Sequence, residues 1–288
     1  MYKFIPVYVG SKSYWVNRLS EFKDKPFVEL FAGSAVLSAN LASETILNDK
    51  DEMVFKILKN FTELYAPDGF TCEDYFRVRG TQEWWKYIYC LQKMSFSGVF
   101  RYSKNGYNVP IKKNQKTINV TEKYNTSKQR YLALNPTVLN MSYDEIPLEL
   151  LAGKVVVLDP PYEGSKASYN DSVSKKENNT KAKKQKKADF DYDKYWGYVR
   201  KVCEVAEVVL VFDAVRNLTK HDIPVYMTRK MRVNGARPGD EEGLSIFEKS
   251  KNAWRSPCVA KTEELSNSLR LEGPSESEIL PQDSPKAA

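Results

Sequence analysis

The 288-residue sequence has one histidine, His221, and four cysteines that lie far apart, with no Cys-x-x-Cys pair. Zinc sites need clustered ligands and disulfide frameworks need paired cysteines, so the sequence indicates neither. No run approaches the roughly 18 apolar residues of a membrane span, and the start of the chain lacks the basic-then-apolar layout of a signal peptide. We therefore expect a soluble cytoplasmic protein that binds no metal and contacts no membrane.

Basic residues outnumber acidic ones. Forty-four Lys and Arg stand against 37 Asp and Glu, which gives a net charge of +7 and a pI near 9.0. This balance favours a polyanionic partner such as nucleic acid, although many basic proteins bind none. A chain of this length has room for one large α/β domain with an insertion.

Two strand-then-helix patterns occur early in the chain. The apolar run at 27–31 leads into Ala32-Gly33-Ser34-Ala35 and then a helical pattern of small residues. A second strand pattern at 45–48 ends at Asp49, and residues 52–65 carry apolar side chains at helical spacing. Two such units in succession imply a parallel sheet.

The second half of the chain continues this sheet after an aromatic and basic stretch at about 72–135. We expect strands at 138–141, 154–158 and 208–212, a short helix within 144–151, a helix at 192–206, and an edge hairpin of 225–233 with 244–248. Two segments are too polar to fold: a lysine-rich loop within 165–190, expected to be mobile, and a disordered tail at 251–288.

The tetrapeptide Asp159-Pro160-Pro161-Tyr162 follows the apolar run Val155-Val156-Val157-Leu158. A carboxylate and a proline carbonyl can accept the two hydrogens of a planar exocyclic amine, and the aromatic ring can stack on its base. Such a pocket suits a nucleobase that has left the helical stack.

Three motifs in order, FVELFAGSAVLSANL, MSFSGVFRYSKNGYNVP and VVVLDPPY, resemble the Dam-type (D12 class, alpha-group) DNA adenine N6-methyltransferases. The likeness runs from about 7 to about 248. It implies an α/β, Rossmann-like fold for methyl transfer from S-adenosylmethionine, with a mostly parallel sheet and an inserted, mainly helical target-recognition region. The expected parts are a cofactor-binding half at 1–70, the insertion at 71–136, a catalytic half at 137–250 and the tail.

The resemblance also implies the cofactor contacts. Gly33 lets the backbone approach the cofactor closely, while Ala35 stands where the family has a second glycine. Asp49 is expected to bind the ribose hydroxyls, with helix capping as the alternative and Asn48 or Asp51 as competitors. The full expected set is Tyr8, Lys12, Phe31, Gly33, Ser34, Asp49, Ser142 and Asp159. For Lys12, an ordinary surface lysine is the alternative.

The chemistry implied at 159–162 is methylation of adenine N6. Hydrogen bonds from the amine to the Asp159 carboxylate and the Pro160 carbonyl would make its nitrogen a better nucleophile. Tyr162 would stack on the flipped base, a contact worth about 1–3 kcal/mol. Asp159, Pro160, Pro161 and Tyr162 are therefore the expected catalytic residues.

The 100–110 segment resembles the family's recognition region, which implies double-stranded DNA as the partner. Arg101 and Asn105 could reach base edges, while lysines would contact phosphates; for each lysine a solvated surface is the alternative. The expected DNA-binding residues are Arg101, Lys104, Asn105, Tyr107, Asn108, Lys112 and Lys113. The lysine-rich loop is expected to add salt-dependent affinity.

Other readings stay open at the level of the sequence. RNA adenine methylation and cytosine N4 methylation use the same or a similar tetrapeptide, and a non-catalytic DNA-binding relative is a further alternative. We expect a monomer or weak dimer in a bacterial or phage-infected cell, associated with the nucleoid, either in a restriction-modification pair or alone.

Overall fold

The computed structural model describes residues 1–162, 190–230 and 241–256. Most of the lysine-rich loop and of the expected tail lies outside these residues. Within the described ranges, none of the helices has the length and apolar character needed to cross a bilayer.

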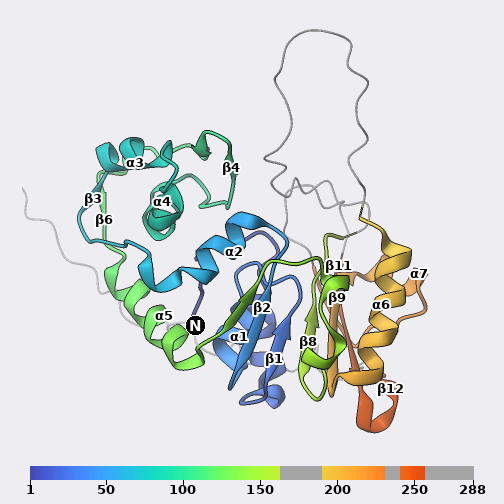
Figure 1. The fold of residues 1–288 in the computed structure, drawn as a ribbon. Coiled ribbons are helices and arrows are strands. Elements are labelled where there is room, and N and C mark those ends of the chain that lie inside the picture. The colour runs from blue at the N-terminus through green and yellow to red at the C-terminus, as the bar shows by residue number, and fades with distance from the viewer. Residues whose placement is uncertain (163–189, 231–240, 257–288) are drawn as a thin grey trace, which may run out of the picture. The chain divides into compact units, whose positions relative to one another are not determined.

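One mixed sheet forms the centre of the fold (Figure 1). Its strands are β1 (Phe27–Glu29), β2 (Thr45–Asn48), β7 (Thr137–Leu139), β8 (Val155–Leu158), β9 (Val208–Ala214), β10 (Met227–Lys230), β11 (Glu241–Glu248) and β12 (Ala253–Trp254). The order is β10-β11-β9-β8-β1-β2-β7, and β12 pairs with β11. The five strands from β9 to β7 are parallel. β11 runs antiparallel to β9, and β10 and β12 each pair antiparallel with β11. The predicted α/β fold with a mostly parallel sheet is confirmed.

Helices cover both faces of the sheet because its central strands are apolar on both sides. Val155 and Val157 of β8 pack into one core cluster, together with α1 (Val36–Leu41), α2 (Glu52–Lys59) and α5 (Thr121–Leu134). Val156 and Leu158 pack into the other cluster with α6 (Tyr192–Val205) and α7 (Val215–Lys220). The burial of every β8 residue explains why its sequence reads as a continuous apolar run.

The aromatic stretch between α2 and α5 folds around its own side chains. It contains β3 (Phe70–Thr71), α3 (Cys72–Arg79), α4 (Ile88–Met94), β4 (Tyr102–Ser103), β5 (Gly106–Tyr107) and β6 (Thr117–Ile118). β4 and β5 form a hairpin, and the Trp84 ring lies 5.4 Å from Tyr102 and 5.7 Å from Tyr107. In Figure 1 these elements, in teal, lie together beyond α2. Their role in target recognition stays a prediction.

Two predicted helices differ in extent from the observed ones. The helix expected at 52–65 ends at Lys59, because the Asn60 side chain donates to the Lys56 carbonyl and a separate 3-10 turn follows at Phe61–Glu63. The helix expected within 144–151 is two 3-10 turns, Tyr143–Glu145 and Leu148–Leu150, with Pro147 between them.

The strand order reverses between β1 and β8. From β1 the chain adds β2 and β7 on one side, and from β8 it adds β9 on the other. Open α/β sheets bind their ligands at the carboxyl ends of the strands beside such a reversal. Phe31 follows β1 and Asp159 follows β8, so both expected site segments lie at this edge.

A buried amide ties three strand ends together at the same edge. Asn48 has no exposed surface, and its Nδ2 donates to the carbonyls of Leu30 (3.0 Å) and Met141 (3.1 Å). Its Oδ1 accepts from the Met141 amide at 3.0 Å. The side chain therefore belongs to the interior and is not available to a ligand.

We predict that Asn48→Ala lowers the free energy of unfolding by about 2–4 kcal/mol, because it leaves three buried backbone groups without partners. Urea denaturation measures this. Asn140 is the matched control: its exposed amide donates once, to the Asp49 carbonyl at 2.7 Å. Asn140→Ala should cost less than about 1 kcal/mol, and equal losses in the two variants would contradict the assignment.

Candidate active site

A cavity of about 1380 Å³ opens at the carboxyl edge of the sheet. It brings together most of the residues that the sequence indicated. These are Tyr8, Lys12, Phe31, Gly33, Ser34, Asp49, Ser142, Asp159, Pro161 and Tyr162, with Lys104 also in the wall. Pro160 is buried beside them. The convergence of segments that are far apart in sequence makes this cavity the candidate active site.

The loop after β1 fits only a glycine at position 33. Gly33 has φ +48°, and a Cβ built there would lie 2.7 Å from Cε1 of Tyr8. Ala35, which replaces the family's second glycine, also takes a left-handed conformation (φ +49°) as α1 begins. The loop thus keeps its turn despite the alanine. The buried Ser34 hydroxyl donates to Ser11 at 3.3 Å and links the loop to the N-terminal segment.

Asp49 supports this loop directly. Its Oδ2 accepts from the Gly33 amide and its Oδ1 from the Asp51 amide, each at 2.9 Å. Asp51, not Asp49, caps α2 by accepting from the amides of Met53 and Val54. Burial raises the pKa of Asp49 to about 7 against the effect of these hydrogen bonds. The capping alternative for Asp49 is therefore wrong.

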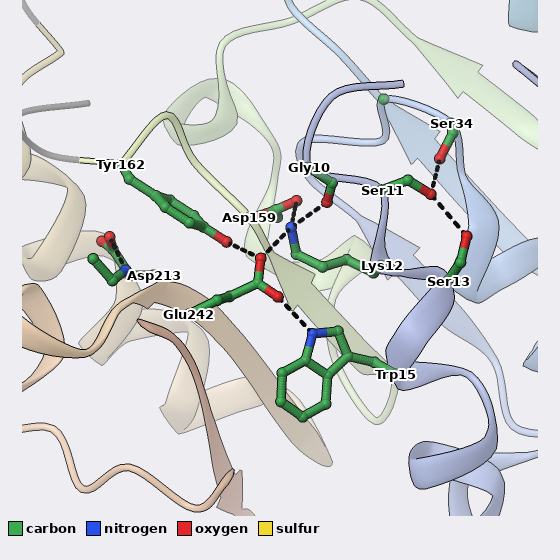
Figure 2. A network of polar contacts seen from close by, with 12 residues as sticks. Gly10, Ser11, Lys12, Ser13, Trp15, Ser34, Asp159, Tyr162, Asp213 and Glu242 are labelled. Carbon is green, nitrogen blue, oxygen red and sulfur yellow. Dashed lines mark hydrogen bonds and ion pairs between the residues drawn. The ribbon is translucent and has the colours of Figure 1, made fainter. Parts of the chain in front are cut away.

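Lys12 is buried at the base of the cavity, so the surface-lysine alternative is also wrong. Its Nζ lies 2.5 Å from Oδ2 of Asp159 and 3.3 Å from Oε1 of Glu242, and it donates to the Gly10 carbonyl at 2.6 Å (Figure 2). Burial opposes the charge, but the two carboxylates raise the pKa of Lys12. Burial raises the pKa of Asp159 to about 6, with Lys12 opposing the shift. Both groups carry their charges at neutral pH.

Two hydrogen bonds hold the tetrapeptide, one at the Tyr162 hydroxyl and one at the Pro161 carbonyl. Tyr162 donates its hydroxyl to Oε1 of Glu242 at 2.7 Å, and the Tyr192 hydroxyl donates to the Pro161 carbonyl at 2.7 Å. Burial and the neighbouring carboxylates raise the pKa of Tyr162 well above its usual range. The hydroxyl therefore stays protonated and acts as a donor.

Sequence reasoning missed two acids of the site. Glu242 lies on β11 and is 3% exposed; Glu29 ends β1, accepts from the Ser38 amide at 2.7 Å, and lines the cavity. Burial raises the pKa of Glu29 to about 7. For Glu29 the available signal was an acidic residue inside the apolar run at 27–31, since charged side chains are rarely buried without a partner.

The predicted DNA-binding residues do not form one group. Arg101 is exposed and donates to the Oδ1 and carbonyl oxygens of Asn108, each at 2.8 Å. Asn105 and Lys113 are exposed, and Lys112 donates to the Lys93 carbonyl. Of the set, only Lys104 lines the cavity.

The structure contradicts the prediction that Tyr107 binds DNA. Its ring is 1% exposed, and its hydroxyl bonds to the Ser95 hydroxyl and the Val99 carbonyl, both at 2.9 Å. A side chain fixed in this way cannot reach DNA. It belongs to the aromatic core of the insertion, because an aromatic residue in a short hairpin buries its ring when a core lies beneath it.

A hydrogen bond links the hairpin to Asp51, which also lines the cavity. The Tyr102 hydroxyl donates to Oδ1 of Asp51 at 2.7 Å, and the Asp51 amide donates to Asp49. The expected recognition element and the expected ribose-binding acid are thus two hydrogen bonds apart. In the described part of the chain, no cluster of acidic, histidine or cysteine side chains has the arrangement of a metal site.

Several solved structures are similar to this chain at low identity. A conserved hypothetical protein from Streptococcus pyogenes has 13% identity over 83% of this chain and 96% of its own, with a TM-score of 0.36. A candidate methyltransferase of Escherichia coli, yhhF, has 12% identity over 82% and 84%, with a TM-score of 0.32. A candidate methylase of Haemophilus influenzae, HI0767, has 11% identity over 82% and 96%, with a TM-score of 0.35.

Comparison with curated proteins gives no match. The family described as D12 class N6 adenine-specific DNA methyltransferase matches residues 8–210, more than half of the chain. The matched region contains the Gly33 loop, Asp49, the hairpin and the tetrapeptide at 159–162. The chain therefore belongs to the D12 class of N6 adenine-specific DNA methyltransferases.

Proposed function

We propose that this protein is a site-specific enzyme that transfers a methyl group from S-adenosylmethionine to N6 of an adenine flipped out of double-stranded DNA. The observation that carries the proposal is the place of Asp159 within the cavity, with its side chain only 23% exposed. A base inside a duplex cannot bring its exocyclic amine to a carboxylate in such a site, whereas an extruded base can.

The residues present fit the cofactor. The missing Cβ of Gly33 lets the Tyr8 ring pack against the loop in the cavity wall, and the Asp49 carboxylate faces the cavity from a fixed position where it could accept from ribose hydroxyls. Phe31 offers an aromatic face in the same wall. When bound, S-adenosylmethionine supplies an electrophilic methyl group on a positively charged sulfur. The Asp159 carboxylate favours such a cation, and a bound cation would in turn favour the ionised forms of Glu29 and Asp49, whose pKa values burial raises to about 7.

Asp159 and its neighbours would orient the adenine amine. The carboxylate and the Pro160 carbonyl would each accept one N6 hydrogen, which fixes the lone pair of the nitrogen toward the cofactor side. Lys12 holds the carboxylate in place, and the anchored Tyr162 ring provides the stacking face. Positioning and charge complementarity account for the catalysis, so no strong base is required.

We predict that Gly33→Ala weakens binding of S-adenosylmethionine about tenfold or more, measured by calorimetry. The added Cβ would overlap the Tyr8 ring at 2.7 Å, and overpacking of this kind costs about 1–3 kcal/mol.

Gly153→Ala is the matched control for Gly33→Ala. Gly153 has φ +68°, yet no atom lies within 4 Å of its built Cβ. This variant therefore carries the same backbone strain without the overlap, and it should bind the cofactor like the unchanged protein. Equal losses of affinity in both variants would show that strain, not the fit of the cavity, is responsible.

The central test is the product. Mass spectrometry should detect N6-methyladenine in duplex DNA incubated with protein and cofactor, and Asp159→Ala should lower the rate by about 10²–10³-fold or more while DNA binding persists. RNA incubated in parallel separates the two substrate classes. Absence of product in every DNA, from protein that binds the cofactor, would refute the proposal.

Methylation should also fail at acidic pH. Asp159 accepts the amine hydrogen as a carboxylate, and burial places its pKa at about 6 in the free protein. Below that pH the carboxyl gains a proton, so kcat/KM for DNA at saturating cofactor should fall by up to about tenfold per pH unit. The residual activity of Asp159→Asn should lack this acidic limb; a limb unchanged in that variant would assign the titration to another group.

A further inference from the structure

Glu242 is the most enclosed ion of the site, and sequence motifs do not point to it. Its side chain is 3% exposed. Glu242 lies on β11, far from Lys12 in the sequence but beside it in the structure (Figure 2). Burial opposes ionisation, but the positive charges of Lys12 and Arg229 lower the pKa of Glu242 to about 2. A buried carboxylate of this kind persists only when its oxygens are paired.

The two oxygens of Glu242 face different parts of the molecule. Oε2 accepts from the Trp15 indole at 2.7 Å and lies 2.5 Å from Nε of Arg229. Oε1 accepts from the Tyr162 hydroxyl at 2.7 Å and lies 3.3 Å from Nζ of Lys12. The first oxygen is thus anchored in the scaffold, and the second reaches the two side chains that surround Asp159.

We propose that Glu242 is a positioning residue of the methyl-transfer site: anchored by Trp15 and Arg229, it sets the orientation of the Tyr162 ring and of the Lys12 ammonium. This proposal rests on the proposed function and assigns to it one further residue, Glu242. Glu242 contacts neither adenine nor cofactor; it acts through the ring that stacks on the base and the cation that holds Asp159.

The substitution Glu242→Gln separates these roles, because glutamine has one acceptor oxygen where glutamate has two. An amide NH2 group turned toward Trp15 and Arg229 would meet two donors, so the oxygen is expected to stay there. The NH2 group would then face Lys12 and lose its ion pair. The Tyr162 hydroxyl, which donates to Glu242, would have to turn and accept from the neutral NH2 group, so the charge-assisted bonds that hold Tyr162 and Lys12 would be lost.

We expect Glu242→Gln to lower kcat about 10–100-fold, since small misplacements in a site have effects of this size. The affinity for S-adenosylmethionine should fall less than kcat, because Gly33 and Asp49 do not touch Glu242, although Lys12, another expected cofactor contact, does. Glu242 also raises the pKa of Asp159 by its negative charge, so the acidic limb of the rate should move to lower pH in the variant. A merely structural role would not move that limb.

Glu248→Gln is the matched control. Glu248 lies on the same strand and forms ion pairs with Lys251 and Arg255, away from the cavity. Its loss should lower stability without changing kcat or the pH profile. Thermal unfolding of both variants corrects the rates for any loss of folded protein.

Tyr162→Phe gives a second measurement that does not depend on the folding of Glu242→Gln. It keeps the stacking ring and removes only the hydroxyl that donates a hydrogen bond to Glu242. We expect kcat to fall about tenfold or more. The double variant should be no slower than Glu242→Gln alone, because the two changes remove the same contact.

Unchanged kcat and pH profile in folded Glu242→Gln, or unchanged kcat in Tyr162→Phe, would overturn the inference. This result differs from failure of the proposed function, in which the unchanged protein itself yields no N6-methyladenine in DNA.

Discussion

The site depends on one buried cation, the ammonium group of Lys12. It lies between Asp159 at the end of β8 and Glu242 on β11, and it pairs with both carboxylates. Without this charge, two acids with exposures of 23% and 3% would face each other in a poorly solvated space. Removing one partner of such a group leaves an uncompensated buried charge, which destabilises strongly. Lys12 thus connects the end of β8 with β11, two strands that β9 separates in the sheet.

This arrangement reconciles two opposing requirements. A carboxylate that accepts from an amine must be accessible, while one that keeps its orientation must be enclosed and paired. Lys12 pairs with Oδ2 of Asp159, and the Asp159 side chain, 23% exposed, still lines the cavity. Glu242 is the more deeply buried of the two acids, and the Trp15 indole donates a hydrogen bond to its Oε2. The desolvation cost of a fully buried carboxylate therefore falls on a residue that does not contact the substrate.

Local patterns predicted the parts of the site that depend on adjacent residues. The Gly33 loop, Asp49 at the end of β2 and the 159–162 tetrapeptide follow buried strands directly, so their place at the carboxyl edge follows from the parallel order. Glu242 and Trp15 could not be found in this way, because their contact spans 227 residues and depends on the register of an antiparallel strand. Tyr107 failed for the opposite reason: a hairpin position does not reveal which face is covered.

The distribution of charge in the cavity also differs from that of the whole chain. The protein carries +7 overall, yet Glu29, Asp49 and Asp159 all line the cavity. Under the proposed function, the ionised Asp159 would favour a cationic cofactor inside, and the bound cation would favour ionisation of Glu29 and Asp49, whose pKa values burial raises to about 7. A polyanion would instead meet lysines such as Lys104 at the wall. Under the same proposal, only the flipped base would enter the cavity, because a nucleobase is neutral. Its phosphates would stay outside, near lysines such as Lys104 at the wall.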